Sequence, residues 1–319
     1  MINFYENKQR SETIAQIVKA KGFDKKVSEL SIAIIDLKKN PSTVFGTNLD
    51  AFMYPASVFK IFIGAEVLRQ IEGGKYTLAQ EILIKPLSDI PKELKLYPNP
   101  RATLKTGDHV TIDILLYLML AVSDNTASNC LYELVGMESI TKNIVEPNGW
   151  QGTGLISYFL NHDKHYKPYR HTDMLQTNAR YVAEFFALVE QEKMISPFVS
   201  RKLKEYMLKF DRTSRHGYSY PEFLRYRKGG YLETNLYTSF YRKSGFGLDV
   251  IKGFGALVKN LVTKGWAFQR YMHDAGVIEG KNSKYVAVIF TLSRQMNPRK
   301  YFQMNELAKE LFEYMEAQN

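Results

Sequence analysis

The sequence predicts an α/β (α+β) protein that is strand-rich at both chain ends and helical in the middle. Strand patterns near both ends, and apolar stretches with helical spacing between them, carry this prediction. With 319 residues, 45% of them hydrophobic, the chain can bury the core of one large domain or of two lobes. Its 13% aromatic content excludes a disordered chain, and no run of about 18 apolar residues predicts a membrane span.

The individual elements follow from apolar spacing and from the Gly, Pro and Asn residues between segments. In the first part of the chain we expect a helix over residues 2–20, strands over Leu30–Leu37 and Ser42–Thr47, and helices over Ser57–Glu72, over Thr111–Ala121 and from about Ala127. A long polar loop is expected over residues 147–177. After it we expect helices over Asn178–Gln191 and from Ser196 to about Phe210, strands over Leu236–Arg242, Trp266–Ile278 and Lys284–Leu292, and a closing helix over Tyr301–Ala317.

The chain is basic, with 43 Lys and Arg residues against 33 Asp and Glu residues and a net charge of +10. Such a charge suits an acidic partner, which can be nucleic acid, an anionic cell-wall polymer or a carboxylate-bearing substrate. The charges are spread along the whole chain, which favours a basic solubilising surface over a single binding patch.

Cysteine usage and the N-terminus bear on the compartment. The single cysteine, Cys130, excludes an intramolecular disulfide and a Cys-based zinc cage, and it suits either redox compartment. The N-terminal residues lack the basic-then-apolar layout of a signal peptide. We therefore expect a protein that stays inside the cell, or a periplasmic or secreted protein whose leader has been removed.

A first motif, Ser57-x-x-Lys60, opens an apolar helix. A spacing of three residues brings both side chains to one helical face. A serine hydroxyl is a weak nucleophile until a neighbour accepts its proton, and a lysine desolvated by apolar neighbours can do so. Ser139-Ile-Thr-Lys142 has the same spacing, so the pattern alone equally describes a capping serine followed by a surface lysine.

A second motif, Ser123-Asp124-Asn125, follows an apolar helix and occurs once. Its hydroxyl can relay a proton to a leaving nitrogen, and its amide can hold a substrate amide. A polar turn that caps the next helix is the alternative.

A third motif, Lys243-Ser244-Gly245, ends the predicted strand Leu236–Arg242. A lysine and a hydroxyl at this position can bind a substrate carboxylate, and glycine lets that substrate lie along the strand edge. Lys105-Thr106-Gly107 has a similar composition but lies in a loop ahead of the Ser-Asp-Asn turn.

In this chain order the three motifs resemble the active site of the penicillin-recognising serine enzymes, most closely of class A β-lactamases. The segment from Met53 to Phe62 resembles the nucleophile segment of that family, and the strand–strand–helix order after Lys243 is similar to its C-terminal end. The resemblance covers roughly residues 28–319. It implies a β-lactamase/transpeptidase-like fold, with an antiparallel sheet of about five strands flanked by the terminal helices.

The resemblance implies a role for each matched side chain. Ser57 would be the nucleophile that forms an acyl-enzyme, and Lys60 would accept its proton. Ser123 would deliver a proton to the departing nitrogen, and Asn125 would hold the substrate amide. Asp124 is interpreted as structural.

The same resemblance places the substrate carboxylate on Lys243 and Ser244, beside Gly245. The oxyanion hole would consist of the backbone N–H groups of Ser57 and Phe246. No cofactor and no metal are implied.

One departure from the family concerns hydrolysis of the acyl-enzyme. Class A β-lactamases carry in their long loop a glutamate that activates the deacylating water, whereas residues 150–177 contain no glutamate here. Asp163 and Asp173 are the only carboxylates in that range. Without such a base, acylation can proceed while deacylation is slow.

Three other patterns in the sequence indicate different functions less specifically. His162, His165 and His171 share a loop with Asp163 but lack metal-ligand spacing on a rigid element. The tyrosine-rich basic segment 211–245 resembles a stacking surface for single-stranded nucleic acid, but no nucleic-acid-binding motif accompanies it. His273 and Asp274 are neighbours on a predicted strand, where adjacent side chains point to opposite faces and cannot form a simple dyad.

We therefore expect an α/β lobe from residues 1–60 and 215–319, a helical lobe from residues 61–214, and an active site at their seam. The predicted function is acyl transfer through a Ser57 acyl-enzyme on a β-lactam or a similar carboxylate-bearing amide. A cell-wall D-Ala-D-Ala-type peptidase, a penicillin-binding protein with slow deacylation, and a non-catalytic binder of anionic ligands are the alternatives. The expected partner is a small molecule or peptide with a carboxylate, with an anionic cell-wall polymer as a further candidate and no nucleic acid.

Overall fold

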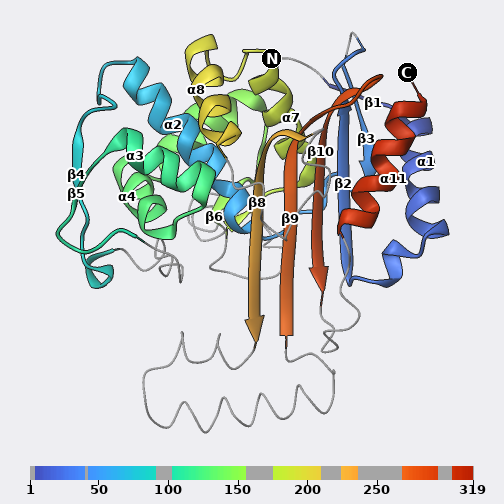
Figure 1. The fold of residues 1–319 in the computed structure, drawn as a ribbon, viewed down its shortest axis with the longest axis horizontal. Coiled ribbons are helices and arrows are strands. Elements are labelled where there is room, and N and C mark those ends of the chain that lie inside the picture. Colours follow the sequence, from blue (N-terminus) through green and yellow to red (C-terminus); the bar gives the residue numbers. More distant parts are fainter. Residues whose placement is uncertain are drawn as a thin grey trace, which may run out of the picture.

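A six-stranded sheet forms the centre of the computed structural model, which describes residues 4–39, 42–90, 103–155, 175–209, 224–235, 268–293 and 304–318. Its strands lie in the order β1 (Tyr5–Glu6), β3 (Thr43–Thr47), β2 (Glu29–Asp36), β10 (Lys284–Ser293), β9 (Phe268–Glu279) and β8 (Leu224–Asn235). Five strands are antiparallel to their neighbours, and the two-residue β1 runs parallel to β3. The predicted fold class, with its sheet built from both chain ends, is thereby confirmed (Figure 1).

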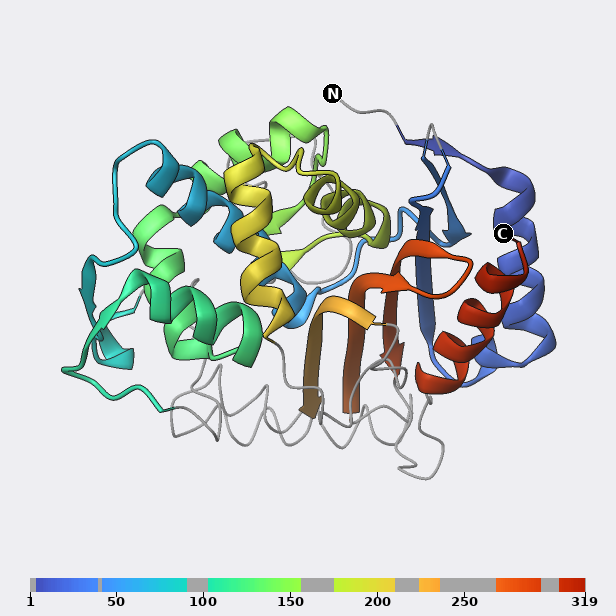
Figure 2. The ribbon, with the colours of Figure 1, turned by 45° about the horizontal axis from the view of Figure 1, so that its top comes forward.

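Both faces of the sheet are apolar at β2 and β10, because side chains of these strands alternate between two cores. On β2, Ala33 and Ile35 belong to the core under the helices, whereas Ile32 and Ile34 belong to the core on the other face. The terminal helices α1 (Lys8–Ala20) and α11 (Met304–Ala317) cover that second face. Figure 2 shows the sheet between this helix pair and the remaining helices.

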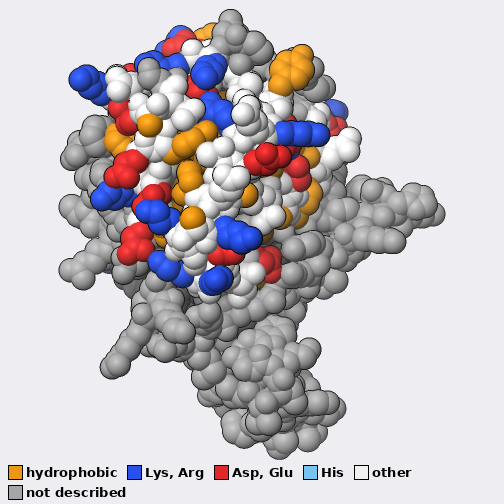
Figure 3. Space-filling model, turned by 90° about the vertical axis from the view of Figure 1, so that its right-hand side faces the viewer, with side chains coloured by type: hydrophobic (Ala, Val, Ile, Leu, Met, Phe, Trp, Pro, Cys, Tyr) orange, Lys and Arg blue, Asp and Glu red, His pale blue; other side chains and the backbone are white. Residues whose placement is uncertain are grey.

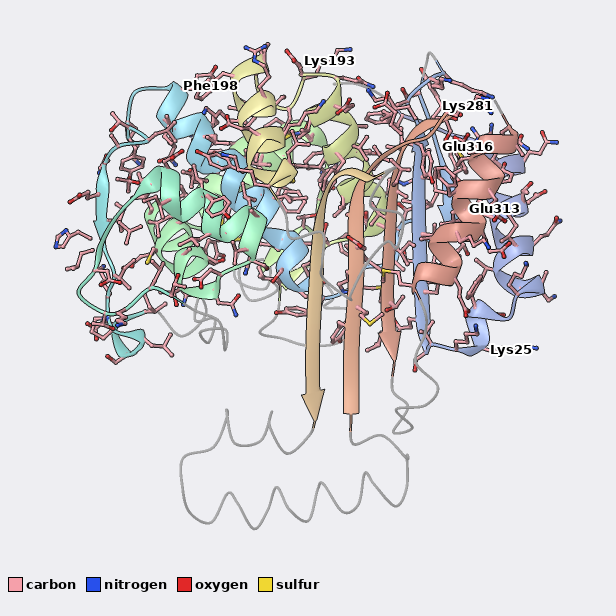
Figure 4. All side chains as sticks on the ribbon, viewed as in Figure 1. Lys25, Lys193, Phe198, Lys281, Glu313 and Glu316 are labelled. Atoms are coloured by element: carbon pink, nitrogen blue, oxygen red, sulfur yellow. The ribbon has the colours of Figure 1, made fainter. Side chains whose placement is uncertain are left out.

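Polar contacts attach the terminal helices to the sheet. Arg10 of α1 reaches Asp36 at the end of β2 with Nη1 2.8 Å from Oδ2, and both side chains are buried. Glu316 of α11 accepts hydrogen bonds from the backbone N–H groups of Asn282 and Ser283 in the β9–β10 turn, next to Lys281 (Figure 4). Such bonds fix both chain ends of the fold to its central strands.

The remaining helices lie on the opposite face of the sheet. They are α2 (Lys60–Glu72), α3 (Ile112–Tyr117), the π-helical turn η4 (Leu118–Val122), α4 (Asn125–Val135), α5 (Met137–Ile140), the π-helical turn η5 (Thr141–Val145), α7 (Ala179–Glu190) and α8 (Pro197–Leu208). Short 3-10 turns lie at Phe23–Lys25 (η1), Ala56–Phe59 (η2), Leu87–Asp89 (η3) and Glu146–Asn148 (η6), and two small sheets pair β4 (Glu81–Leu83) with β5 (His109–Thr111) and β6 (Gly154–Leu155) with β7 (Leu175–Gln176).

Helix α7 packs directly on the sheet, against β2, β9 and β10, and also on α8. At its end Glu190 pairs with Lys284 of β10 and with Lys204 of α8, each at 2.7 Å. The proposed division at residues 60/61 and 214/215 stays a prediction, since α7 contacts both parts of the fold.

Three elements differ from the sequence-based expectation. The helix expected over residues 2–20 begins only at Lys8, after Tyr5–Glu6 have formed strand β1. The helix expected over Thr111–Ala121 is α-helical only to Tyr117 and continues as η4, which ends immediately before Ser123. The strand beside β9 is β8, Leu224–Asn235, which the sequence analysis did not predict, and the strand expected over Leu236–Arg242 lies outside the described residues.

The face over α1 and α11 mixes charges of both signs (Figure 3). Lys21 pairs with Glu310, and Lys26 pairs with Glu306. The described basic residues of this face are therefore interspersed with acidic ones. Within the described ranges, no helix is long and apolar enough to cross a membrane.

Candidate active site

Ser57 lies in η2, the 3-10 turn that leads directly into α2. Its neighbours Ala56, Val58 and Phe59 are buried, while Ser57 itself stays partly exposed. Ala56 has φ +49°, a left-handed conformation that a non-glycine residue adopts at a cost of about 1 kcal/mol or more. The Ser57 side chain is thus reachable from solvent and follows directly on a residue with a strained backbone.

Lys60, one turn further on, is buried at 2% exposure and directs its amine away from the helix. Its Nζ lies 2.7 Å from the carbonyl oxygen of Ser123 and 2.7 Å from Oδ1 of Asn125. Longer contacts reach Ser123 Oγ at 3.3 Å and the Asp124 carbonyl oxygen at 3.4 Å. Burial lowers the pKa of Lys60 to about 7, against the opposing effect of the nearby Asp124 carboxylate.

The Ser123-Asp124-Asn125 turn is held in an unusual backbone conformation. Ser123 has φ +66° and ends η4, and the Asp124 N–H donates to the Leu118 carbonyl oxygen at 2.8 Å. Asp124 then caps α4, with its Oδ1 accepting the Ala127 N–H at 2.8 Å. Lys60 therefore binds a preorganised turn rather than a mobile loop.

This arrangement joins three of the predicted residues by hydrogen bonds, since Lys60 contacts both Ser123 and Asn125. The fourth, Ser57, lies three residues before Lys60, in the turn that leads into α2. An amine with a pKa near 7 is substantially neutral at physiological pH, so it can accept a proton. Its hydrogen-bonded contact with Ser123 Oγ provides a route along which that proton can move.

The strand next to the nucleophile is β8, which lies against η2. The described residues do not include the predicted carboxylate-binding and oxyanion residues Lys243, Ser244, Gly245 and Phe246. Their assignment therefore stays a prediction.

Strand β8 carries a Lys-x-Gly segment of its own, Lys228-Gly229-Gly230, that the sequence analysis did not single out. Its register pairs Lys228 with Ala275 and Gly230 with His273 of β9. The ring of His273 contacts the carbonyl oxygen of Tyr54, three residues before Ser57, at 2.7 Å. The sequence offered one signal for this segment, a Lys-x-Gly pattern ahead of the strand expected over Trp266–Ile278. Its two consecutive glycines, however, are unusual inside a strand and argued against this interpretation.

The ends of the predicted long loop lie beside the nucleophile segment. Gly154–Leu155 pairs with Leu175–Gln176, and Thr177 exchanges two backbone hydrogen bonds with Met53, at 2.9 and 3.1 Å. The described residue Thr177 is thereby joined to Met53, four residues before Ser57. Asp163 and Asp173, and the three loop histidines, fall outside the described residues.

The second Ser-x-x-Lys segment and the Lys-Thr-Gly segment lie in other parts of the structure. Ser139 donates its hydroxyl hydrogen to the buried carboxylate of Glu66, and Lys142 is exposed. Lys105-Thr106-Gly107 forms a turn ahead of β5, at the far end of the helical part in Figure 1. In the described part of the chain, no group of three or more His, Cys, Asp or Glu side chains is placed to hold a metal ion.

Comparison with known proteins agrees with the fold and the motifs. The sequence matches the profile of the beta-lactamase enzyme family over residues 9–315. Because that match spans nearly the whole chain, the protein belongs to this family. A search of curated protein sequences returned no match.

Solved structures of class A β-lactamases and of PBP-A share the fold. A class A β-lactamase from Bacteroides cellulosilyticus superposes with a TM-score of 0.64 at 17% identity, covering 96% of this chain and 98% of the other. A PBP-A variant in an acyl-enzyme complex with penicillin G gives a TM-score of 0.63 at 15% identity, covering 98% and 99%. The TLA-1 extended-spectrum β-lactamase gives 0.63 at 13% identity, covering 96% and 98%. At these identities the likeness establishes the fold, which is that of a β-lactamase-family serine hydrolase.

Proposed function

We propose that this protein is a serine acyl-transfer enzyme that opens a β-lactam, or a similar amide next to a carboxylate, through an acyl-enzyme on Ser57. The observation that carries the proposal is the buried Lys60 amine, hydrogen-bonded to Ser123 and Asn125. A desolvated lysine one helical turn from a serine, with a second hydroxyl in contact, supplies both proton transfers that amide opening needs.

In the first step the Ser57 hydroxyl attacks the amide carbon while Lys60 accepts its proton. The developing oxyanion is stabilised by backbone N–H groups, of which the Ser57 N–H is one. The C–N bond then breaks, Ser123 delivers a proton to the departing nitrogen, and Lys60 returns its proton to Ser123. The product is an ester on Ser57 with the amine released or, for a lactam, retained in the same molecule.

We assign the substrate carboxylate to a lysine on the strand beside Ser57. The predicted residues are Lys243 and Ser244, with Phe246 giving the second oxyanion N–H. The register of β8 supports Lys228 as an alternative, because Gly230 pairs with His273, whose ring contacts the nucleophile segment. By the same family logic, the second N–H would then come from Tyr231, the residue after the glycine.

Hydrolysis of the acyl-enzyme is proposed to be slow. Residues 150–177 contain no glutamate, and an aspartate (Asp163 or Asp173) has a shorter reach toward a deacylating water. This favours a penicillin-binding type of behaviour, or a cell-wall peptidase, over rapid β-lactam hydrolysis. A periplasmic or secreted location and an anionic cell-wall polymer as a partner accord with such a substrate.

The experiment combines a fluorescent penicillin, which detects the acyl-enzyme, with a chromogenic cephalosporin, which detects turnover. A stable fluorescent adduct that is lost in Ser57→Ala, with little turnover, supports the proposal. Rapid turnover of the cephalosporin would correct the proposal to an efficient β-lactamase. No adduct and no turnover with any β-lactam or ester would point to a non-catalytic binder of anionic ligands.

A further inference from the structure

A buried histidine on the central sheet is attached to the segment that carries Ser57. His273 of β9 is 3% exposed, and both of its ring nitrogens are hydrogen-bonded. Nδ1 lies 3.1 Å from the backbone nitrogen of Thr291, and Nε2 lies 2.7 Å from the carbonyl oxygen of Tyr54. The second contact joins strand β9 to a residue 219 positions earlier, three residues ahead of the nucleophile.

These partners define the tautomer of the ring. A backbone N–H can only donate, so Nδ1 must be an unprotonated acceptor, and Nε2 must carry the hydrogen that it donates to the Tyr54 carbonyl. The ring stacks at 4.4 Å on Phe290 and packs against Tyr271. Burial lowers the pKa of His273 to about 4, so the ring stays neutral at pH 7 and retains this tautomer.

The hydrogen bond from His273 to Tyr54 acts on the short segment between Met53 and Ser57, whose backbone is constrained at both ends. Upstream, Met53 is paired with Thr177, and the Tyr54 ring packs edge-on against Tyr271 at 5.5 Å. Downstream, Ala56 holds its left-handed conformation immediately before Ser57. Backbone strain of this kind persists only where surrounding contacts enforce it. The His273 bond to the Tyr54 carbonyl is such a contact.

We propose that His273 is a positioning residue, which holds the Tyr54 carbonyl and through it the orientation of the Ser57 hydroxyl and N–H. Its effect on catalysis rests on the proposed acylation at Ser57, whereas its effect on the backbone does not. A displacement of about 1 Å at a reacting group costs about 100-fold in rate. Loss of the bond should therefore slow the acylation step by about 10- to 100-fold and leave non-covalent binding of the β-lactam nearly unchanged.

Two substitutions separate the two bonds of the ring. His273→Gln places an N–H near the position of Nε2 and retains the donor to Tyr54, while His273→Asn places an oxygen near the position of Nδ1 and retains the acceptor for Thr291. We expect the first variant to keep acylation within about threefold of the parent and the second to lose it. Equal losses in both variants, tracking their thermal stability, would show a packing role and overturn the proposal.

Backbone hydrogen exchange of the peptide containing residues 53–59 provides a readout that needs no substrate. Exchange should increase in His273→Asn and not in His273→Gln, and unchanged exchange in both would overturn the proposal. If the parent protein is not acylated at all, the proposed function fails while this comparison still decides the positioning role. Should neither variant fold, ¹⁵N spectra of the parent decide the point, because a hydrogen on Nδ1 at pH 7 would contradict the bond to Tyr54.

Discussion

Nζ of Lys60 lies 2.7 Å from Oδ1 of Asn125, so helix α2 is joined directly to the turn that follows η4. A buried amine needs hydrogen-bond acceptors, and here the Ser123 carbonyl oxygen and the Asn125 amide oxygen supply them. The contact makes Lys60 a structural link between two motifs that are more than sixty positions apart.

Replacing Lys60 should abolish acylation without abolishing the fold. Lys60→Met keeps the apolar stem and removes the base, so acylation by a fluorescent penicillin should fall about 100- to 10,000-fold. Stability should fall by about 1–3 kcal/mol, because two partly buried acceptors lose their hydrogen bonds to Lys60. The matched control is Lys142→Met in the other Ser-x-x-Lys motif, where Lys142 is exposed and acylation should not change. Equal acylation in parent and Lys60→Met would contradict the assigned role.

The acylation rate should depend on pH through Lys60. Its pKa is lowered to about 7, and only the neutral amine accepts the Ser57 proton. The rate should therefore rise as the pH increases from 6 to 8 and level off above that. The lowered pKa of Lys60 also affects the free energy of unfolding. Between about pH 7 and 10.4 the folded state binds fewer protons at this group than the unfolded state does, so the stability of the fold increases with pH across that range. A flat rate profile in stopped-flow acylation would argue against Lys60 as the base.

A carboxylate at position 125 should move that profile. In Asn125→Asp the new charge would lie close to Nζ and favour the ammonium form, which raises the pKa of Lys60. The inflection of the acylation profile should move upward by at least about one pH unit, while Asn125→Ala should not move it upward. An unchanged inflection in Asn125→Asp would mean that another group controls the rate.

The carboxylate-binding lysine can be identified by comparing two variants. If β8 supplies it, Lys228→Ala should weaken acylation by carboxylate-bearing β-lactams about tenfold or more, since a charge-assisted hydrogen bond contributes about 1.5–3 kcal/mol. A neutral ester substrate should be affected much less, and Lys243→Ala should behave like the parent. The reverse result, with selective loss in Lys243→Ala, would restore the assignment made from the sequence.

The Glu66 cluster should control stability rather than activity. Glu66 accepts hydrogen bonds from Ser139, Gln70 and Asn143 and pairs with Arg69, and its side chain is fully buried. Burial acts to raise the pKa of this carboxyl, but these hydrogen bonds and Arg69 hold it below its ordinary value. Its contribution is therefore present above about pH 4.3 and is lost as the pH falls through the lowered pKa.

Glu66→Ala should lower the free energy of unfolding by about 3–5 kcal/mol at pH 7 in urea titrations, because the partners of a buried charge are left unpaired. Glu133→Ala is the control, since Glu133 forms an exposed pair with Lys85 and should change stability by less than about 1 kcal/mol. Equal effects of the two substitutions would show that the cluster is not a stabilising network.

Local pattern accounts for what the sequence predicted correctly. The apolar runs Leu30–Leu37 and Lys284–Leu292 and the apolar stretch Ser57–Glu72 lie close to the observed β2, β10 and α2. Strand β8 was missed because Lys228-Gly229-Gly230 carries the glycines that ordinarily interrupt strands, whereas its pairing with β9 is a long-range contact that local pattern does not reveal. The contact of His273 with Tyr54 could not be predicted, because the two residues are 219 positions apart in the sequence.

The most direct test of the central claim is an intact-mass time course after mixing the protein with penicillin G, followed by peptide mapping. We predict a single addition of one penicillin molecule, located on the peptide that contains Ser57, absent in Ser57→Ala, and persisting long after unbound penicillin is removed. An addition on another residue, or no addition to the parent protein, would contradict the account.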